Sequence, residues 1–89
     1  MGGTPEGRSW YQLLGVEDFA AADEIRSAYL RLARSLHPDL QIEASPAEQR
    51  ITERRMREVN AAWAVLGNEE SRRVYDTGLR MRESYRSTF

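Results

Sequence analysis

Apolar residues recur with helical spacing in two stretches of this chain, the first of which covers residues 21–36. Its apolar positions follow one another at steps of four, three and four residues: Ile25, Tyr29, Leu32 and Leu36. This spacing places their side chains on one face of an α-helix. Arg26, Leu30 and Arg34 fall on the opposite face. The pattern predicts a helix over 21–36 with one buried and one exposed face.

The second stretch predicts a helix over 47–66. Its repeating positions are spaced by four and three residues: Thr52, Met56, Val59, Trp63 and Leu66. Ser45 and Pro46 come directly before it, and serine is a favoured N-cap while proline is accepted at the first helical position. Both stripes have the period of a coiled-coil seam, and the segment between them is short. We therefore expect the two helices to pack as an antiparallel hairpin.

Shorter helices are predicted at both ends of this hairpin. Ser9 is a suitable N-cap for a helix over 10–14, and Gly15 is a suitable stop. A last short helix is expected to begin near Glu69, and it either ends near Gly78 or continues beyond it. The predicted fold class is thus all-α, a two-helix hairpin braced by short N- and C-terminal helices.

The same pattern sets the expected domain limits. Residues 1–8 are polar and rich in glycine, so we expect a disordered leader there. Residues 9–78 are expected to form the folded domain, and 79–89 a C-terminal extension that is helical if the last helix continues.

The tripeptide His37-Pro38-Asp39 lies just after the first long helix. Proline disfavours helical geometry in the residue before it and has no backbone N–H, so the helix should end near Leu36 or His37. Catalysis by His37 would need partners, and the chain has no cysteine and no second histidine. Capping of the helix end and an Asx-type turn bond at Asp39 remain alternatives. We interpret the turn as a group of polar side chains presented to a partner.

Composition narrows the classes of function. At 89 residues and 10.3 kDa the chain has room for one small domain. The absence of cysteine leaves no disulfide or thiolate metal site and fits a cytoplasmic location. No stretch approaches the length of a membrane span. The net charge of −1 argues against strong nucleic-acid binding as the main function, and we expect a monomer with neither cofactor nor metal.

Several segments together resemble the J domain of Hsp40 (DnaJ-type) co-chaperones. They are residues 11–16 (YQLLGV), 25–33 (IRSAYLRLA), 37–39 (HPD), 59–66 (VNAAWAVL) and 72–76 (RRVYD). The resemblance covers about residues 9–78, with the tripeptide between the two long helices. A lone tripeptide would recur by chance, whereas these motifs in this order are specific.

The resemblance implies a module that docks on ATP-bound Hsp70 and stimulates its ATP hydrolysis, without binding nucleotide itself. It implies that His37, Pro38 and Asp39 form the signalling loop. It also implies that Arg26, Tyr29 and Arg31 lie on a helix whose basic surface meets an acidic surface of Hsp70. We add Leu30 as an apolar contact on the same exposed face.

Some residues depart from the family pattern. Ser27 and Leu30 occupy positions that are often basic, and Leu40 follows the tripeptide where a basic residue is common. Met56 and Trp63 replace common aromatic residues with side chains of fitting size. These differences leave the fold intact and bring the strength of Hsp70 binding into question. No Gly/Phe-rich linker or client-binding region follows, so the chain is either part of a longer protein or a stand-alone J protein.

Two other functions stay open. A J-like scaffold would keep the fold without stimulating an ATPase. A small nucleic-acid-binding module would use the arginines of the second long helix: Arg50, Arg54, Arg55 and Arg57. Glu48, Glu53 and Glu58 alternate with these arginines, and this favours intrahelical ion pairs over a binding patch.

Overall fold

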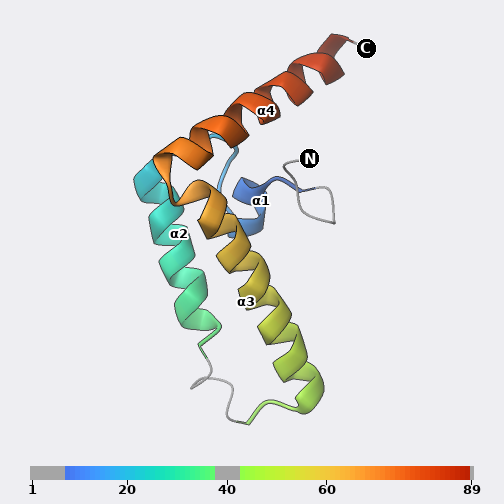
Figure 1. The fold of residues 1–89 in the computed structure, drawn as a ribbon. Coiled ribbons are helices and arrows are strands. Elements are labelled where there is room, and N and C mark those ends of the chain that lie inside the picture. The colour runs from blue at the N-terminus through green and yellow to red at the C-terminus, as the bar shows by residue number, and fades with distance from the viewer. Residues whose placement is uncertain (1–7, 38–42, 89) are drawn as a thin grey trace.

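The computed structural model describes residues 8–37 and 43–88, with residues 85–88 described by their backbone alone. This part of the chain forms four helices: α1 (Trp10–Leu14), α2 (Ala22–Ser35), α3 (Pro46–Leu66) and α4 (Glu69–Thr88). In Figure 1, α2 and α3 run side by side in opposite directions, and α4 crosses one end of the pair. The prediction of an all-α fold built on an antiparallel hairpin is confirmed.

Local sequence signals set the N-termini of α1 and α3 and the C-terminus of α1. The side chain of Ser9 accepts a hydrogen bond from the backbone N–H of Gln12, and the side-chain oxygen of Gln12 accepts one from the backbone N–H of Ser9. Ser45 and Glu48 repeat this capping box at α3, where Pro46 is the first helical residue. Gly15 ends α1 in the left-handed region, with φ of 80°. Only glycine adopts that conformation without a steric penalty, so this stop is specified by the sequence.

The core lies where α1 covers the hairpin. Its buried hydrophobic residues come from all four helices: Tyr11, Leu13, Leu14, Ile25, Ala28, Val59, Ala62, Leu66 and Tyr75. Tyr29, Leu32, Leu36 and Trp63 are partly buried against this cluster. The first stripe and the later part of the second stripe, from Val59 onward, therefore contribute to the core, together with Ala28 and Ala62 beside them. Thr52 and Met56 belong to the second stripe but not to this cluster.

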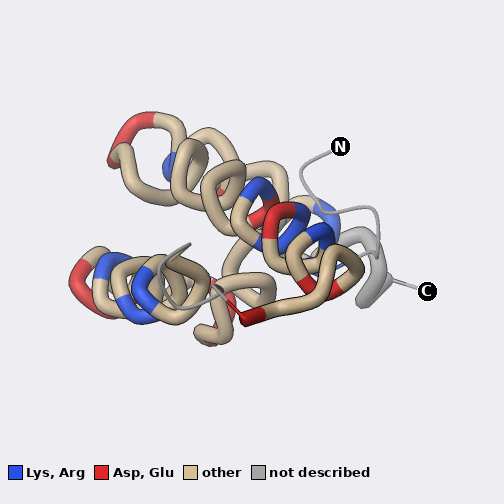
Figure 2. Tube along the Cα trace, turned by 90° about the horizontal axis from the view of Figure 1, so that it is seen from below, with Lys and Arg blue, Asp and Glu red and all other residues tan. Residues whose placement is uncertain are grey.

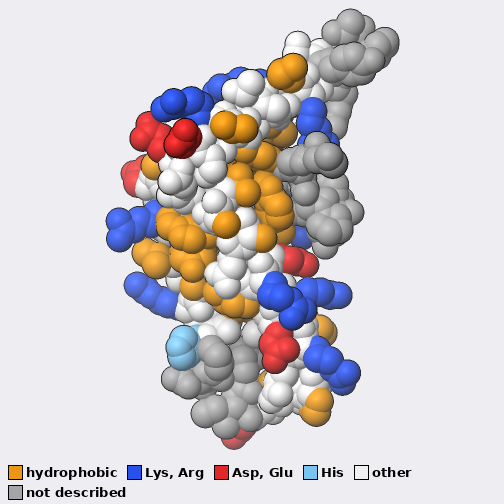
Figure 3. All heavy atoms as spheres, in the orientation of Figure 1, with side chains coloured by type: hydrophobic (Ala, Val, Ile, Leu, Met, Phe, Trp, Pro, Cys, Tyr) orange, Lys and Arg blue, Asp and Glu red, His pale blue; other side chains and the backbone are white. Residues whose placement is uncertain are grey.

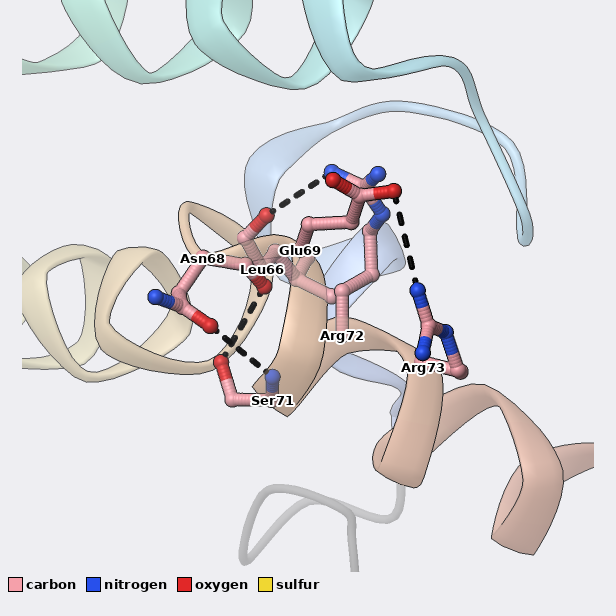
Figure 4. Close-up of polar contacts among 6 residues, drawn as sticks. All are labelled: Leu66, Asn68, Glu69, Ser71, Arg72 and Arg73. Carbon is pink, nitrogen blue, oxygen red and sulfur yellow. Dashed lines mark hydrogen bonds and ion pairs between the residues drawn. The ribbon is translucent and has the colours of Figure 1, made fainter.

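The helix α4 is longer than the short brace that the sequence predicts. It has 20 residues and passes through Gly78, so the longer of the two endings that the sequence left open is the one observed. Figure 4 shows its start, where the backbone N–H of Ser71 donates to Oδ1 of Asn68 at 3.0 Å. The guanidinium of Arg72 donates to the carbonyl oxygen of Leu66 at 3.4 Å. These bonds satisfy backbone groups at the corner between α3 and α4.

Hydrogen bonds of tyrosine side chains join α1 to α4, two helices that are far apart in the sequence. The hydroxyl of Tyr11 donates to Asp76 at 2.5 Å, and the backbone N–H of Trp10 donates to the hydroxyl of Tyr75 at 3.0 Å. Burial raises the pKa of Tyr11, and the hydrogen bond to Asp76 raises it further. Burial also raises the pKa of Tyr75. The first and last helices are thereby held together around the core.

The connection between α1 and α2 is fixed against α4. Phe19 has φ of 66°, a conformation that residues other than glycine rarely adopt. Its ring lies 6.0 Å from the ring of Tyr11, and Cζ of Arg80 lies 4.7 Å from its centroid. Ser9 also donates a hydrogen bond to Asp18 in this segment. The chain thus enters α2 from a connection that α1 and α4 both hold in place.

Candidate partner-docking surface

The helix α2 ends where the tripeptide predicts. It stops at Ser35, Leu36 is its C-cap, and the backbone N–H of His37 donates to the carbonyl of Arg34 at 3.3 Å. His37 is exposed at this end of the hairpin. Pro38 and Asp39 lie outside the described residues. The structure thus places the first member of the tripeptide at the tip of α2, and the other two stay predictions.

The outer face of α2 carries the other predicted contact residues. Arg26, Leu30 and Arg31 are all exposed, with Leu30 at 41%. Leu30 stands four residues from Arg26, so these two side chains share a face. Figure 2, viewed from the loop end of the hairpin, shows basic residues on both long helices. The face of α2 is therefore mixed, with cations around an apolar centre.

Tyr29 differs from these residues because it ties the face of α2 to α3. Its ring stacks on the ring of Trp63, with centroids 4.5 Å apart and an angle of 11° between the planes. Its hydroxyl donates to Oδ1 of Asn60 at 3.3 Å. The ring of Tyr29 is therefore packed, and its hydroxyl lies toward the surface. Tyr29 is thus held in one orientation beside the exposed contacts.

Trp63 packs closely against the backbone at Gly67. A Cβ atom at Gly67 would lie 2.7 Å from Cδ2 and Cε2 of Trp63, well inside contact distance. The backbone after α3 therefore passes directly against the indole ring. The stack of Tyr29 on Trp63 and the contact of Trp63 with Gly67 were not predicted from the sequence. The apolar period indicated only that Tyr29 and Trp63 face the hairpin seam.

The arginines of α3 do not form the ion pairs that the sequence suggests. Among the described residues of α3, no arginine lies within 4 Å of a carboxylate oxygen, whereas Arg73 on α4 pairs with Glu69 at 3.7 Å. Arg50 instead donates from Nε to the carbonyl oxygen of Pro46 at 3.3 Å. Exposed pairs gain little free energy against solvent and side-chain entropy, which accounts for the difference. The expectation of intrahelical pairs on α3 was wrong.

The described residues offer little for small-molecule chemistry. They contain no group of three or more His, Asp or Glu side chains placed to hold a metal ion. None of the helices in this part of the chain is both long and apolar enough to cross a membrane. Figure 3 shows hydrophobic side chains over the centre of one face, with basic side chains along both edges. The arrangement suits contact with another macromolecule.

Comparisons with known proteins identify the family. A model of the DnaJ domain matches residues 9–76. The chain is 44% identical over 70 residues to chaperone protein DnaJ 2 of Thermus thermophilus, covering 79% of this chain and 23% of that protein. It is 38% identical over 81 residues to chaperone protein DnaJ of Hydrogenobacter thermophilus, covering 89% and 21%. The chain belongs to the DnaJ domain family.

A solved structure supports the same assignment. The J domain of a mouse DnaJ-like protein, determined in solution, superimposes with a TM-score of 0.73 at 30% sequence identity. The match covers 88% of this chain and 87% of that domain. The chain spans only 23% and 21% of the two bacterial relatives, so the comparison concerns the domain rather than those whole proteins.

Proposed function

We propose that this domain docks on the ATP-bound state of an Hsp70 chaperone of the DnaK type and stimulates its ATP hydrolysis. The observation that carries the proposal is the exposed face of α2, which holds Arg26, Leu30 and Arg31 and ends at the exposed His37. An exposed row of this kind beside a tightly packed core is suited to recognition. Membership of the DnaJ domain family supplies the identity of the partner.

Each residue of the site has a proposed role. The guanidinium groups of Arg26 and Arg31 meet carboxylates on the acidic surface of Hsp70, since arginine binds carboxylates with paired hydrogen bonds. Leu30 adds an apolar contact between them. Tyr29, held by Trp63, keeps this part of α2 in register with α3.

The tripeptide carries the signal in this proposal. His37, Pro38 and Asp39 contact Hsp70 at the end of the docked face, and Asp39 pairs with an arginine of the chaperone. Removal of one member of a desolvated charge pair costs about 2–5 kcal/mol of binding free energy. The loop is therefore expected to be more sensitive to substitution than the arginines of α2, which are exposed and screened by salt.

We further propose that the domain is not an enzyme and acts as a cytoplasmic monomer without cofactor or metal. A phosphate-binding loop of the common type needs a lysine after its glycines, and this chain contains no lysine. In this proposal Hsp70, and not this domain, binds and hydrolyses the ATP. ATP turnover by the purified domain alone would contradict this part of the proposal.

A single-turnover ATPase assay with purified Hsp70 tests the proposal. The unchanged domain should accelerate hydrolysis, and Asp39→Asn should abolish most of the acceleration. Glu43→Gln is the matched control, since it removes an exposed carboxylate four residues after Asp39 in the sequence and leaves the tripeptide unchanged. If the unchanged domain gives no acceleration at saturating concentration, the chain is a J-like scaffold. If both variants stimulate equally, the role assigned to Asp39 is wrong.

A further inference from the structure

The first half of α3 is a helical segment that contributes no buried residue to the described part of the chain. None of residues 46–57 is buried, whereas the buried residues of α3 are Val59, Ala62 and Leu66 in its second half. Figure 1 shows α3 diverging from α2 toward this end. Local bonds hold the segment instead: the Ser45 capping box and the bond from Arg50 to Pro46. This length of helix is presented to solvent rather than used to build the core.

Its outer face carries a row of arginines. Arg50, Arg54 and Arg57 are spaced by four and three residues, so they lie along one side of the helix. Arg50 and Arg54 each stand two residues from Thr52, and two residues rotate a helix by about 200°. The row therefore lies opposite the seam that faces the core. All three side chains are exposed, and none has a carboxylate partner among the described residues.

An exposed isoleucine borders this row. Ile51 is 58% exposed, whereas Thr52 and Met56, which belong to the predicted stripe, are partly buried. Ile51 and the arginine row line a shallow depression of about 280 Å³, with Glu53 on its other side. The sequence contains one weak indication that Ile51 is exposed, which is that Ile51 falls outside the repeat that defines the buried stripe. An apolar side chain beside unpaired guanidinium groups is the composition of a protein-docking site.

We propose that Arg50, Ile51, Arg54 and Arg57 form a second docking surface, the α3 row, which binds an acidic protein segment with an apolar residue among its carboxylates. Guanidinium groups bind carboxylates through paired, charge-assisted hydrogen bonds, and the bond to Pro46 leaves the terminal nitrogens of Arg50 for such a pair. The apolar residue of the partner covers Ile51. This surface lies on a different helix from the Arg26 and His37 contacts, and it does not depend on the Hsp70 proposal.

The chemistry of the row favours a protein over a nucleic acid. Glu53 borders the depression, and a carboxylate there is able to pair with a basic residue of a protein, a partner that a nucleic acid does not offer. Ile51 has no ring on which a base would stack, and stacking on aromatic side chains supplies much of single-strand binding.

Peptide binding to the 89-residue chain tests the α3 row directly. The probe is a fluorescein-labelled twelve-residue peptide of alternating Asp and Glu with a central Leu, followed by anisotropy at low ionic strength. Binding is expected, and Ile51→Ser or Arg54→Gln should each weaken it at least about tenfold, as loss of a central contact does. Arg55→Gln is the matched control, because Arg55 lies beside the row without lining the depression and should leave the affinity within about twofold.

Other outcomes of the same experiment overturn the proposal. A peptide that does not bind, or that binds all three variants equally well, excludes the α3 row. If NMR amide chemical shifts change on α2 rather than around Ile51 when the peptide is added, the peptide binds the exposed face of α2 instead. Tighter binding of a twelve-nucleotide single strand, with the loss confined to the arginine variants, replaces the protein partner with a nucleic acid. Each variant is checked by its thermal melt, and the exposed positions should change stability by under about 0.5 kcal/mol.

Discussion

The two ends of the helical hairpin are built differently. At the body end, α1 and α4 cover α2 and α3, and every buried residue of the described chain lies there. At the loop end, formed by residues 30–37 and 46–57, no residue is buried, and arginines, His37, Leu30 and Ile51 face solvent. The body end is held by apolar contacts and by tyrosine hydrogen bonds between α1 and α4. The loop end is held by helix caps and short-range bonds.

The difference shows how a domain of 89 residues separates stability from recognition. A small domain has little apolar area to bury, so placing its core at one end leaves the other end free for exposed cations. The two ends are still mechanically connected. The stack of Tyr29 on Trp63 fixes the face of α2 relative to α3 at the border between them. Substitutions at the body end should therefore change stability, and those at the loop end should change binding.

Truncation of Trp63 should have the largest effect on stability. Trp63→Ala removes the stack with Tyr29 and the contact with Gly67, and replacement of a packed tryptophan typically costs about 3 kcal/mol or more. Denaturant unfolding followed by circular dichroism measures the change. Val74→Ala is the control, because Val74 is 71% exposed and should change the unfolding free energy by under about 0.5 kcal/mol. Equal midpoints for the two variants would place Trp63 outside the packed region.

Alkaline pH should weaken the body end through the tyrosines of α1 and α4. The pKa of Tyr11 is raised in the folded state, so the folded protein holds that proton more tightly than the unfolded chain. Its contribution to stability is complete below the unfolded pKa of about 10 and is lost as pH rises from there through the folded pKa. The pKa of Tyr75 is raised too and acts in the same direction.

Tyr11→Phe tests this alkaline effect. The variant loses the bond to Asp76, so it should be less stable at neutral pH by about 1 kcal/mol. It also lacks the titrating hydroxyl, so its unfolding free energy should fall less steeply above pH 10 or so than that of the unchanged protein. Urea melts at a series of pH values give both slopes. Parallel curves would show that Tyr11 does not link stability to pH.

The smallest change in stability is expected for Leu30→Lys at the loop end. A third cation beside Arg26 and Arg34 should raise the rate of association with an acidic Hsp70 surface, by a factor that falls as salt is added. Stopped-flow binding at two ionic strengths measures the rates. Val74→Lys is the matched control, since it adds the same charge at an exposed position on α4. Equal rates for the two variants at low salt would argue against docking through α2.

The sequence predicted the hairpin because its signals are local and periodic. Ile25 and Val59 each belong to one of the two stripes, and both are fully buried. The caps at Ser9 and Ser45 were recognisable from neighbouring residues alone. The contacts between α1 and α4 were not, because Tyr11 and Asp76 are 65 residues apart and neither belongs to a repeat.

The remaining differences also have physical causes. The length of α4 was left open by Gly78, since a glycine inside a helix costs about 1 kcal/mol relative to alanine. Beyond that glycine, Arg80 contacts the ring of Phe19 and so links the continued helix to the connection before α2. In the candidate site, the exposed face of α2 followed from its period, whereas the stack of Tyr29 on Trp63 depended on three-dimensional packing. The exposure of Ile51 was visible only as a position outside the buried stripe.

The central claim is that the loop end serves recognition and contributes little to stability. A paired measurement on His37→Gln tests it most directly: the thermal melt of the domain and the single-turnover ATPase rate of Hsp70, on the same preparation. His37 is exposed and lies beyond the end of α2. We therefore expect the free energy of unfolding of the variant to lie within about 0.5 kcal/mol of that of the unchanged protein. We expect stimulation of Hsp70 to be lost. Full stimulation by the folded variant, or a domain that unfolds when His37 is replaced, would contradict the account.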